Sequence, residues 1–124
     1  MTTQNIGRGS WREELDGFSR RHEGWLVSIT TRGPGGNVAV EARDMPFQGV
    51  SLASPHSSDI AITVGDGRTH LTHEVRETAA VEIELTASQA ERALVIHGND
   101  GTTTTIDFRS PTLPEEADGL RAPV

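Results

Sequence analysis

The spacing of the apolar residues changes at Gly24, and this change constrains the fold more than any other feature of the sequence. On the N-terminal side the apolar stripe has the spacing of one helix face: Trp11, Leu15 and Phe18, continued by His22. On the C-terminal side apolar and polar residues alternate from Trp25 onward, as they do along a half-buried β-strand. The pattern predicts a helix over residues 11–23 and strands within residues 25–109.

Several short segments keep this alternation, and Val81, Ile83 and Leu85, which are separated by glutamates, show it most clearly. About eight such strands follow one another. Because each has one apolar and one polar face, they are expected to pair in antiparallel fashion with one face in water. A meander of this length has to curl or divide into layers. We therefore predict an α+β, mostly β fold, in which the N-terminal helix packs on an antiparallel meander of about eight short strands. The meander forms a small barrel or strongly bent sheet, with a β-sandwich as the alternative.

The charged cluster at the end of the predicted helix is the first candidate for a ligand- or partner-binding site. Arg20 and Arg21 lie where the negative end of the helix dipole favours cations, and Gly24 suits the left-handed conformation that ends a helix. At the other end, Ser10 has the spacing of a capping box. We predict that the cluster is mostly a joint between helix and strand, in which a partly buried His22 fixes the helix to the sheet.

The register of the hairpin around Asp66-Gly67 can be predicted from parity, because a slip of one residue would put its apolar side chains in water. A two-residue turn at these residues places His73 opposite Ile60, which makes His73 a second candidate, with a partly buried, hydrogen-bonded histidine as the structural interpretation. The same register places Asp59 opposite Glu74, either as a cation site or as a frayed strand end.

The last hairpin holds the third candidate, His97. A three-residue loop over residues 99–101 pairs Leu94 with Ile106, with the final glycine in the left-handed bulge position. The outer face then carries His97 opposite Thr103, and Asp107 lies two pairs further along. This separation, and the lack of a nucleophile-elbow sequence, favour a solvated β-face over a Ser/His/Asp arrangement. We predict no catalytic residue.

Both ends of the sequence are poor in apolar residues. We expect residues 1–9 and the proline-rich residues 110–124 to be disordered tails, flanking a single folded domain over residues 10–109. No signal-peptide pattern or long apolar run is present, so we expect no membrane association and a cytoplasmic location.

Composition excludes several functions. The sequence has no cysteine, which removes disulfides and thiolate metal sites, and we predict no metal and no cofactor. The formal net charge is -7 and aromatic residues make up 4%, which argues against nucleic acid, because its binders need basic surfaces and stacking platforms. A protein partner is compatible with this charge, including a second copy paired through an edge strand.

The string from Trp11 to Leu26, W-x-x-x-L-x-x-F-S-R-x-H-x-G-W-L, is similar to a small bacterial family designated as a domain of unknown function, DUF5335. The resemblance extends through "GVSL" (49–52), "HLTHEV" (70–75) and "NDGTTTTIDF" (99–108) and covers most of the predicted folded body. It implies a short chain and no assigned activity, so it identifies no residue as catalytic.

Three functional hypotheses remain, in order of preference. The first is a non-enzymatic protein-interaction or regulatory module, which fits the small, acidic, β-rich chain. The second is a small-ligand-binding barrel with the N-terminal helix as its lid. The third is an enzyme that uses a histidine as acid or base.

Overall fold

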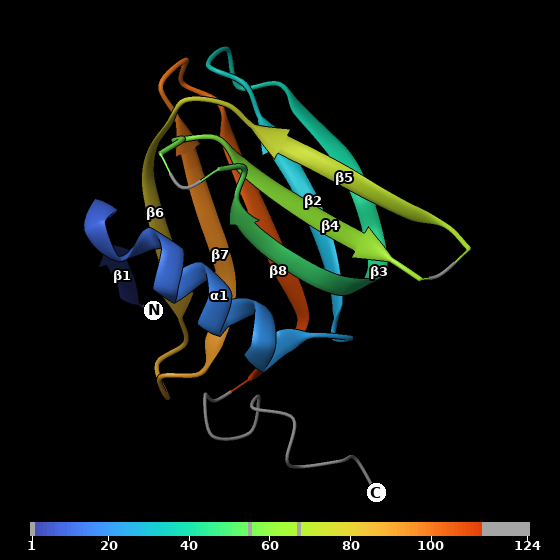
Figure 1. Cartoon of the computed structure of the whole chain (residues 1–124). Helices are drawn as coiled ribbons and strands as arrows, with labels where there is room; N and C mark the ends of the chain where they lie inside the picture. Colours follow the sequence, from blue (N-terminus) through green and yellow to red (C-terminus); the bar gives the residue numbers. More distant parts are fainter. Residues whose placement is uncertain (1, 55, 67, 113–124) are drawn as a thin grey trace, which may run out of the picture.

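The computed structural model describes residues 2–54, 56–66 and 68–112, in which one helix packs against a strongly curved sheet (Figure 1). In chain order the elements are β1 (Thr2–Ile6), the short 3-10 helix η1 (Arg8–Ser10), α1 (Trp11–His22), β2 (Leu26–Arg32), β3 (Val38–Leu52), β4 (Ile60–Gly65), β5 (His70–Val75), β6 (Thr78–Leu85), β7 (Glu91–Gly98) and β8 (Thr103–Thr112). The predicted fold class, α+β and mostly β, is confirmed.

The eight described strands form one sheet in the order β1-β6-β7-β8-β2-β3-β4-β5, and every neighbouring pair is antiparallel. Within the described residues the two end strands, β1 and β5, do not pair with each other, so the sheet is open. The strongly bent sheet is therefore the form that is confirmed, rather than a closed barrel or a sandwich of two separate sheets.

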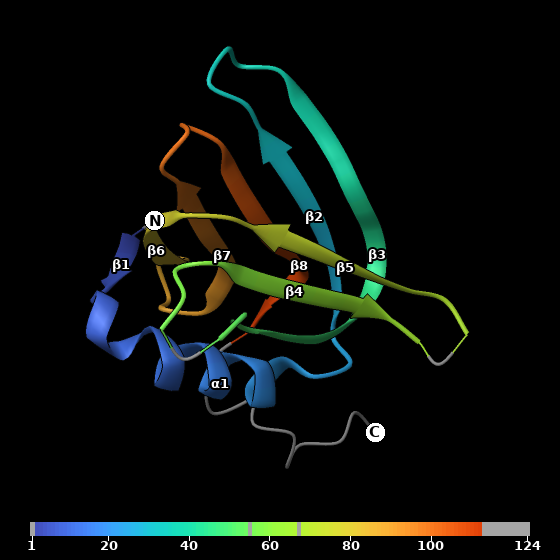
Figure 2. The ribbon, with the colours of Figure 1, turned by 45° about the horizontal axis from the view of Figure 1, so that its top comes forward.

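Strand β3 makes the bend. Its first part pairs with β2 and its second part with β4, and the register shifts in both pairings. Asp44, within β3, has a positive φ of 50°. Bulges of this kind bend a strand without ending its pairing, which explains how a single strand of 15 residues can pair with both β2 and β4. As a result β4 and β5 cross in front of β8 and β2 (Figures 1 and 2).

The hydrophobic core lies between the two arms of this bent sheet, and α1 covers one end of it (Figure 2). The predicted helical stripe is confirmed, because all four of its members are buried: Trp11, Leu15, Phe18 and His22. A polar contact adds to the packing of α1 on β3. The Ser19 hydroxyl accepts a hydrogen bond from the Val50 amide at 2.8 Å, and it lies within hydrogen-bonding distance of the Leu15 and Val50 carbonyls.

The two ends of the helix differ in how well they were predictable. Gly24 has a φ of 86°, so the left-handed residue after the helix is confirmed, although α1 ends one residue earlier than predicted, at His22. The prediction of a capping box is wrong, because the Ser10 side chain makes no capping hydrogen bond. The turn of 3-10 helix that precedes α1 places Ser10 in a helical conformation, and its amide instead donates to the Gly7 carbonyl at 2.9 Å.

The prediction of a disordered tail over residues 1–9 is wrong, because residues 2–6 form β1 and pair with β6. Four of the five β1 residues are exposed, so the segment lacks the apolar alternation that marks other strands. Its pairing comes from backbone hydrogen bonds, and only Ile6 is buried. At the other end, β8 continues past the predicted boundary to Thr112. The rest of the predicted C-terminal tail, residues 113–124, lies outside the described residues.

The two predicted hairpin registers have different outcomes. In the last hairpin Leu94 pairs with Ile106 as predicted, and Gly101 has the predicted left-handed φ, at 89°. In the β4–β5 hairpin Ile60 pairs with Val75 instead of His73, a shift of two residues. The turn is longer than two residues, because Gly65 still pairs with His70. Parity cannot separate registers that differ by two, since both keep the same side chains on the same face.

Substitution of Gly65 by alanine is expected to lower the stability by about 1–3 kcal/mol, the usual cost of a strained backbone. Gly65 has a φ of 117°, and a Cβ there would lie 2.2 Å from the Thr69 carbonyl oxygen. Thermal unfolding measures the effect. Gly9→Ala is the matched control, because nothing lies within 4 Å of its added Cβ. Equal melting temperatures for both variants would contradict the backbone geometry of this turn.

Candidate functional site

The charged cluster at the end of α1 contains a buried ionic group. Arg21 donates to both carboxylate oxygens of Glu91 on β7, at 2.9 and 3.3 Å. His22 has no exposed surface, and its Nδ1 lies 2.9 Å from the Phe18 carbonyl oxygen. Its Nε2 lies 3.1 Å from a Glu91 oxygen, within ion-pair distance but not in the direction of a well-formed hydrogen bond. The ring of Phe108 covers His22, with ring centroids 4.3 Å apart.

These contacts indicate a structural anchor. Burial by itself raises the pKa of Glu91, but the contacts from His22 and Arg21 outweigh burial and hold that pKa below its ordinary value. Glu91 is therefore a carboxylate at neutral pH and joins the end of α1 to β7. The predicted burial of His22 at the helix–sheet joint is confirmed. Arg20 is exposed and forms no ion pair with any residue that the structure describes.

Sequence reasoning missed Glu91 because a β-bulge reverses its direction. Glu91 pairs with Leu85 and Ala93 pairs with Glu84, so two β7 residues stand opposite one residue of β6 at this point. Arg92 consequently reaches Glu84 on the outer face, at 3.3 Å, while Glu91 turns toward the helix. Regular alternation from the buried Leu94 would instead direct Arg92 inward and Glu91 outward.

The third candidate, His97, lies on the outer face of the sheet. Its Nε2 contacts the Glu82 carboxylate of β6 at 2.5 Å, and its Nδ1 lies 3.4 Å from the Thr103 hydroxyl of β8. The predicted pairing of His97 with Thr103 is confirmed, and Asp107 lies two pairs further along this face as predicted, opposite Ala93. Glu82 was not predicted. Its outward direction could be read from its place between Val81 and Ile83, but its approach to His97 is diagonal across β6 and β7.

A hydroxyl, a histidine and a carboxylate in contact resemble the groups of a hydrolase triad, but the surroundings do not suit that chemistry. The side chains of His97 and Glu82 are 38% and 29% exposed, on an open sheet face. The backbone amides here belong to strands with a neighbour on both sides, so ladder hydrogen bonds occupy the donors that an oxyanion hole would need. Nearby Asp107 has its pKa raised by burial, with Arg92 opposing the shift and Glu84 adding to it.

The second candidate, His73, lies on the inner face of β5 and is half-buried, opposite Ile62. The predicted pairing of Asp59 with Glu74 is wrong, because the two-residue shift places Glu74 opposite Ala61. The two carboxylates have other partners. Asp59 accepts from the Glu77 amide at 2.9 Å, and Glu74 pairs with Arg76 at 3.0 Å.

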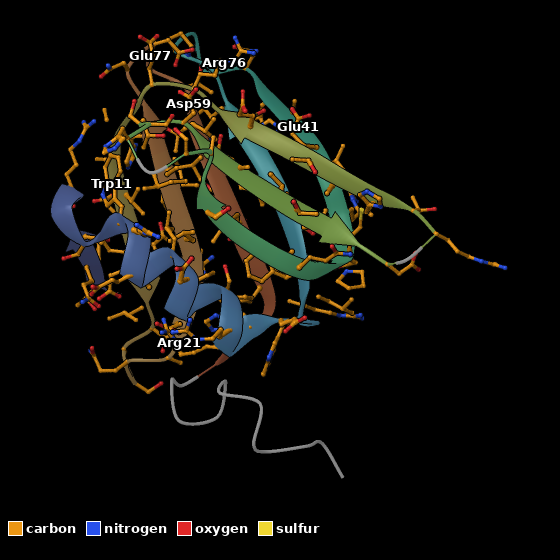
Figure 3. The ribbon with its side chains drawn as sticks, viewed as in Figure 1. Trp11, Arg21, Glu41, Asp59, Arg76 and Glu77 are labelled. Carbon is orange, nitrogen blue, oxygen red and sulfur yellow. The ribbon has the colours of Figure 1, made fainter. Side chains whose placement is uncertain are left out.

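His73 belongs to a cleft at the end of the bent sheet opposite α1, which we call the open-end cleft. It has a volume of about 370 Å³ and runs between β5 on one side and parts of β2, β3, β8 and the β7–β8 loop on the other. Nine residues line it: Thr31, Glu41, His73, Glu74, Val75, Arg76, Asp100, Thr102 and Thr104. Figure 3 shows Glu41 and Arg76 at this end of the molecule, whereas Arg21 lies at the helix end.

Two carboxylates give the open-end cleft its negative charge. Glu41 accepts a hydrogen bond from the Thr31 hydroxyl at 3.0 Å, and Asp100 accepts one from the Thr102 amide at 2.9 Å. The contacts of Thr102 lower the pKa of Asp100, so it is ionised at neutral pH. Neither carboxylate forms an ion pair within the described part of the chain. Arg76 does not offset them, because it pairs with Glu74.

The described residues contain no cluster of three metal-ligating side chains, and none of their helices is long and apolar enough to cross a membrane. The fold and the site thus define a class of small β-rich proteins in which a helix closes one end of an open, bent sheet and a polar cleft lies at the other. Residues 2–117 match the family of unknown function DUF5335, so the chain belongs to this family and the resemblance seen in the sequence is confirmed. Comparisons with curated proteins and with solved structures give no match.

Proposed function

We propose that this protein is a non-enzymatic binding module that takes a positively charged segment of a partner protein at the open-end cleft. The observation that carries the proposal is a pair of carboxylates, Glu41 and Asp100, that line the cleft and form no ion pair within the described residues. Lysine and arginine side chains provide the positive charge and the hydrogen-bond donors that complement these carboxylates. The net charge of -7 adds a long-range attraction for a basic partner.

The alternative of a ligand-binding barrel with α1 as its lid has less support from the packing. The side chains that α1 directs inward, including Leu15 and Phe18, are completely buried and belong to the core cluster. They occupy the space that a ligand enclosed beneath α1 would need. The hypothesis of a histidine acid or base also has less support, because His22 is sequestered in an ion-paired cluster and His97 lies on an open face.

The double substitution Glu41→Gln and Asp100→Asn is expected to weaken binding of a basic peptide by about 2- to 30-fold, from two exposed ion pairs of about 0.2–1 kcal/mol each. The amide side chains keep the acceptors for Thr31 and Thr102, so the local hydrogen bonds are preserved. The probe is a fluorescent, capped octapeptide of alternating lysine and valine, titrated at low salt and followed by anisotropy. Added salt should weaken its binding.

The matched control is Glu14→Gln with Glu23→Gln, which removes the same charge from exposed positions at the helix end. If only net charge mattered, both double variants would lose equal affinity, and the open-end cleft would not be the binding place. The corresponding peptide of alternating glutamate and valine should not bind. Failure of the lysine–valine peptide to bind the unaltered protein would refute the proposed function.

A further inference from the structure

Strand β5 borders the open-end cleft and has one free edge. It pairs with β4 along its whole length, from His70 opposite Gly65 to Val75 opposite Ile60. On its other side no described strand pairs with it, since β5 is the last strand in the sheet order. Backbone N–H and C=O groups on that side therefore have no ladder partner, which makes the edge a template for another strand. Three residues of β5 also line the cleft: His73, Glu74 and Val75.

The β4–β5 hairpin is held in place before any partner arrives. The Asp66 carboxylate accepts hydrogen bonds from the Arg68 and Thr69 amides, at 2.9 Å each, and these bonds lower its pKa. From β3, the Gln48 side chain donates to the Gly65 carbonyl at 2.7 Å. Figure 2 shows the hairpin extending away from the rest of the sheet. A preformed edge of this kind loses little conformational entropy when a partner binds.

We infer that the partner segment is an extended strand that adds to the free edge of β5, with its main chain paired to β5 and a lysine or arginine side chain reaching into the open-end cleft. This inference rests on the proposed function and specifies how the same site works. Strand addition draws affinity from main-chain hydrogen bonds and specificity from alternate side chains. The free β5 edge supplies the main-chain hydrogen bonds, and Glu41 and Asp100 supply the specificity for a basic side chain.

The inner face of β5 indicates the order of side chains in the segment. Leu71 on this face is 38% exposed and apolar, and it lies outside the cleft. His73 and Val75, two and four residues further, line the cleft. Because residues two apart share a face, the segment is expected to place basic side chains at alternate positions on this inner face. One of them can reach the cleft while the aliphatic stem of another packs beside Leu71. A six-residue edge buries a small area, so the complex is weak and transient.

Charge favours a basic partner over a second copy of this chain as the occupant. Two copies with a net charge of -7 each repel one another. The edge strands that a second copy could offer are β1 (TTQNI) and β5 (HLTHEV), and neither contains a lysine or an arginine to pair with Glu41 and Asp100.

The test uses the lysine–valine octapeptide and two N-methylated forms of it. One form is methylated at the lysine amides and the other at the valine amides, so each loses the hydrogen-bond donors along one edge of the extended peptide. We expect at least tenfold weaker binding for one form and a smaller loss for the other. In parallel, amide hydrogen exchange of the full chain should show peptide-dependent protection at alternate residues of β5, with β1 as the comparison edge.

Each outcome separates the two proposals. If both methylated peptides bind within twofold of the parent peptide and β5 gains no protection, strand addition is wrong while the proposed function stands. If even the parent peptide fails to bind, the proposed function fails and the inference with it. If β5 becomes protected as the concentration of the protein rises without peptide, a second copy is the occupant and the choice of a basic partner is wrong.

Discussion

Replacement of Phe18 by alanine is expected to lower the free energy of unfolding by about 3–5 kcal/mol, the usual cost of removing a buried phenylalanine. Phe18 has no exposed surface and belongs to the main core cluster. Its ring contacts those of Phe47 and Phe108, with centroids 5.8 and 5.5 Å apart, so it joins α1 to both arms of the bent sheet. The cavity left by alanine cannot be filled by one neighbour alone, because the surrounding residues come from three elements.

Urea denaturation measures this effect, as a lower midpoint at an unchanged slope. Val38→Ala is the control, because Val38 is 54% exposed on the outer face of β3 and its truncation should change stability by less than about 0.5 kcal/mol. A loss of less than about 1 kcal/mol for the Phe18 variant would mean that α1 does not pack on the core as described.

Replacement of Glu91 by glutamine is expected to cost about 3 kcal/mol at neutral pH, the low end of the range for breaking a buried ion pair. The low end applies because a quarter of the Arg21 side chain remains exposed and keeps contact with water. The substitution preserves the shape of Glu91 but leaves Arg21 and the buried His22 without their anionic partner. Chemical denaturation gives the free energy, and Glu74→Gln, which breaks the exposed pair with Arg76, is the control.

The same cluster predicts a pH dependence with a definite sign. The folded-state pKa of Glu91 lies below its ordinary value of 4.5, so the folded protein favours the carboxylate. The stability from Glu91 is therefore fully present above pH 4.5 and is lost as the pH falls through the lower, folded-state pKa. The difference in stability between the parent protein and the Glu91→Gln variant should shrink in acid. A difference that stayed constant down to acid pH would show that the charge of Glu91 is not the source of its contribution to stability.

Local patterns in the sequence were enough to predict the helix and the inner faces of most strands. The stripe from Trp11 to His22 depends only on spacing within one helix, and the pairing of Leu94 with Ile106 depends on one short loop. Features that depend on distant or irregular backbone were not predictable. The β3 strand continues through Asp44 because a bulge keeps its pairing with β2, whereas the sequence there suggests a break.

The candidate site shows the same division. His22 and His73 could be identified as inward-facing, because alternation and helical spacing place them. The residues around them could not be identified. Glu91 turns inward at a bulge in β7, and Glu41 reaches the open-end cleft from β3 beside a register shift in the β2–β3 pairing. Irregular positions of this kind bring together charged groups that alternation alone would keep apart.

The position of β8 in the sheet has a consequence for how the chain is made. This strand is the last of the described strands in chain order, yet it lies in the middle of the sheet between β7 and β2. The ladder that joins the β2–β3 part to the β6–β7 part therefore cannot form until β8 has left the ribosome. Until then the nascent chain exposes the apolar faces of two incomplete half-sheets. The sheet is thus completed only after both of its parts have been made, and its folding is slowed by contacts such as Val27 with Phe108 that close a long loop.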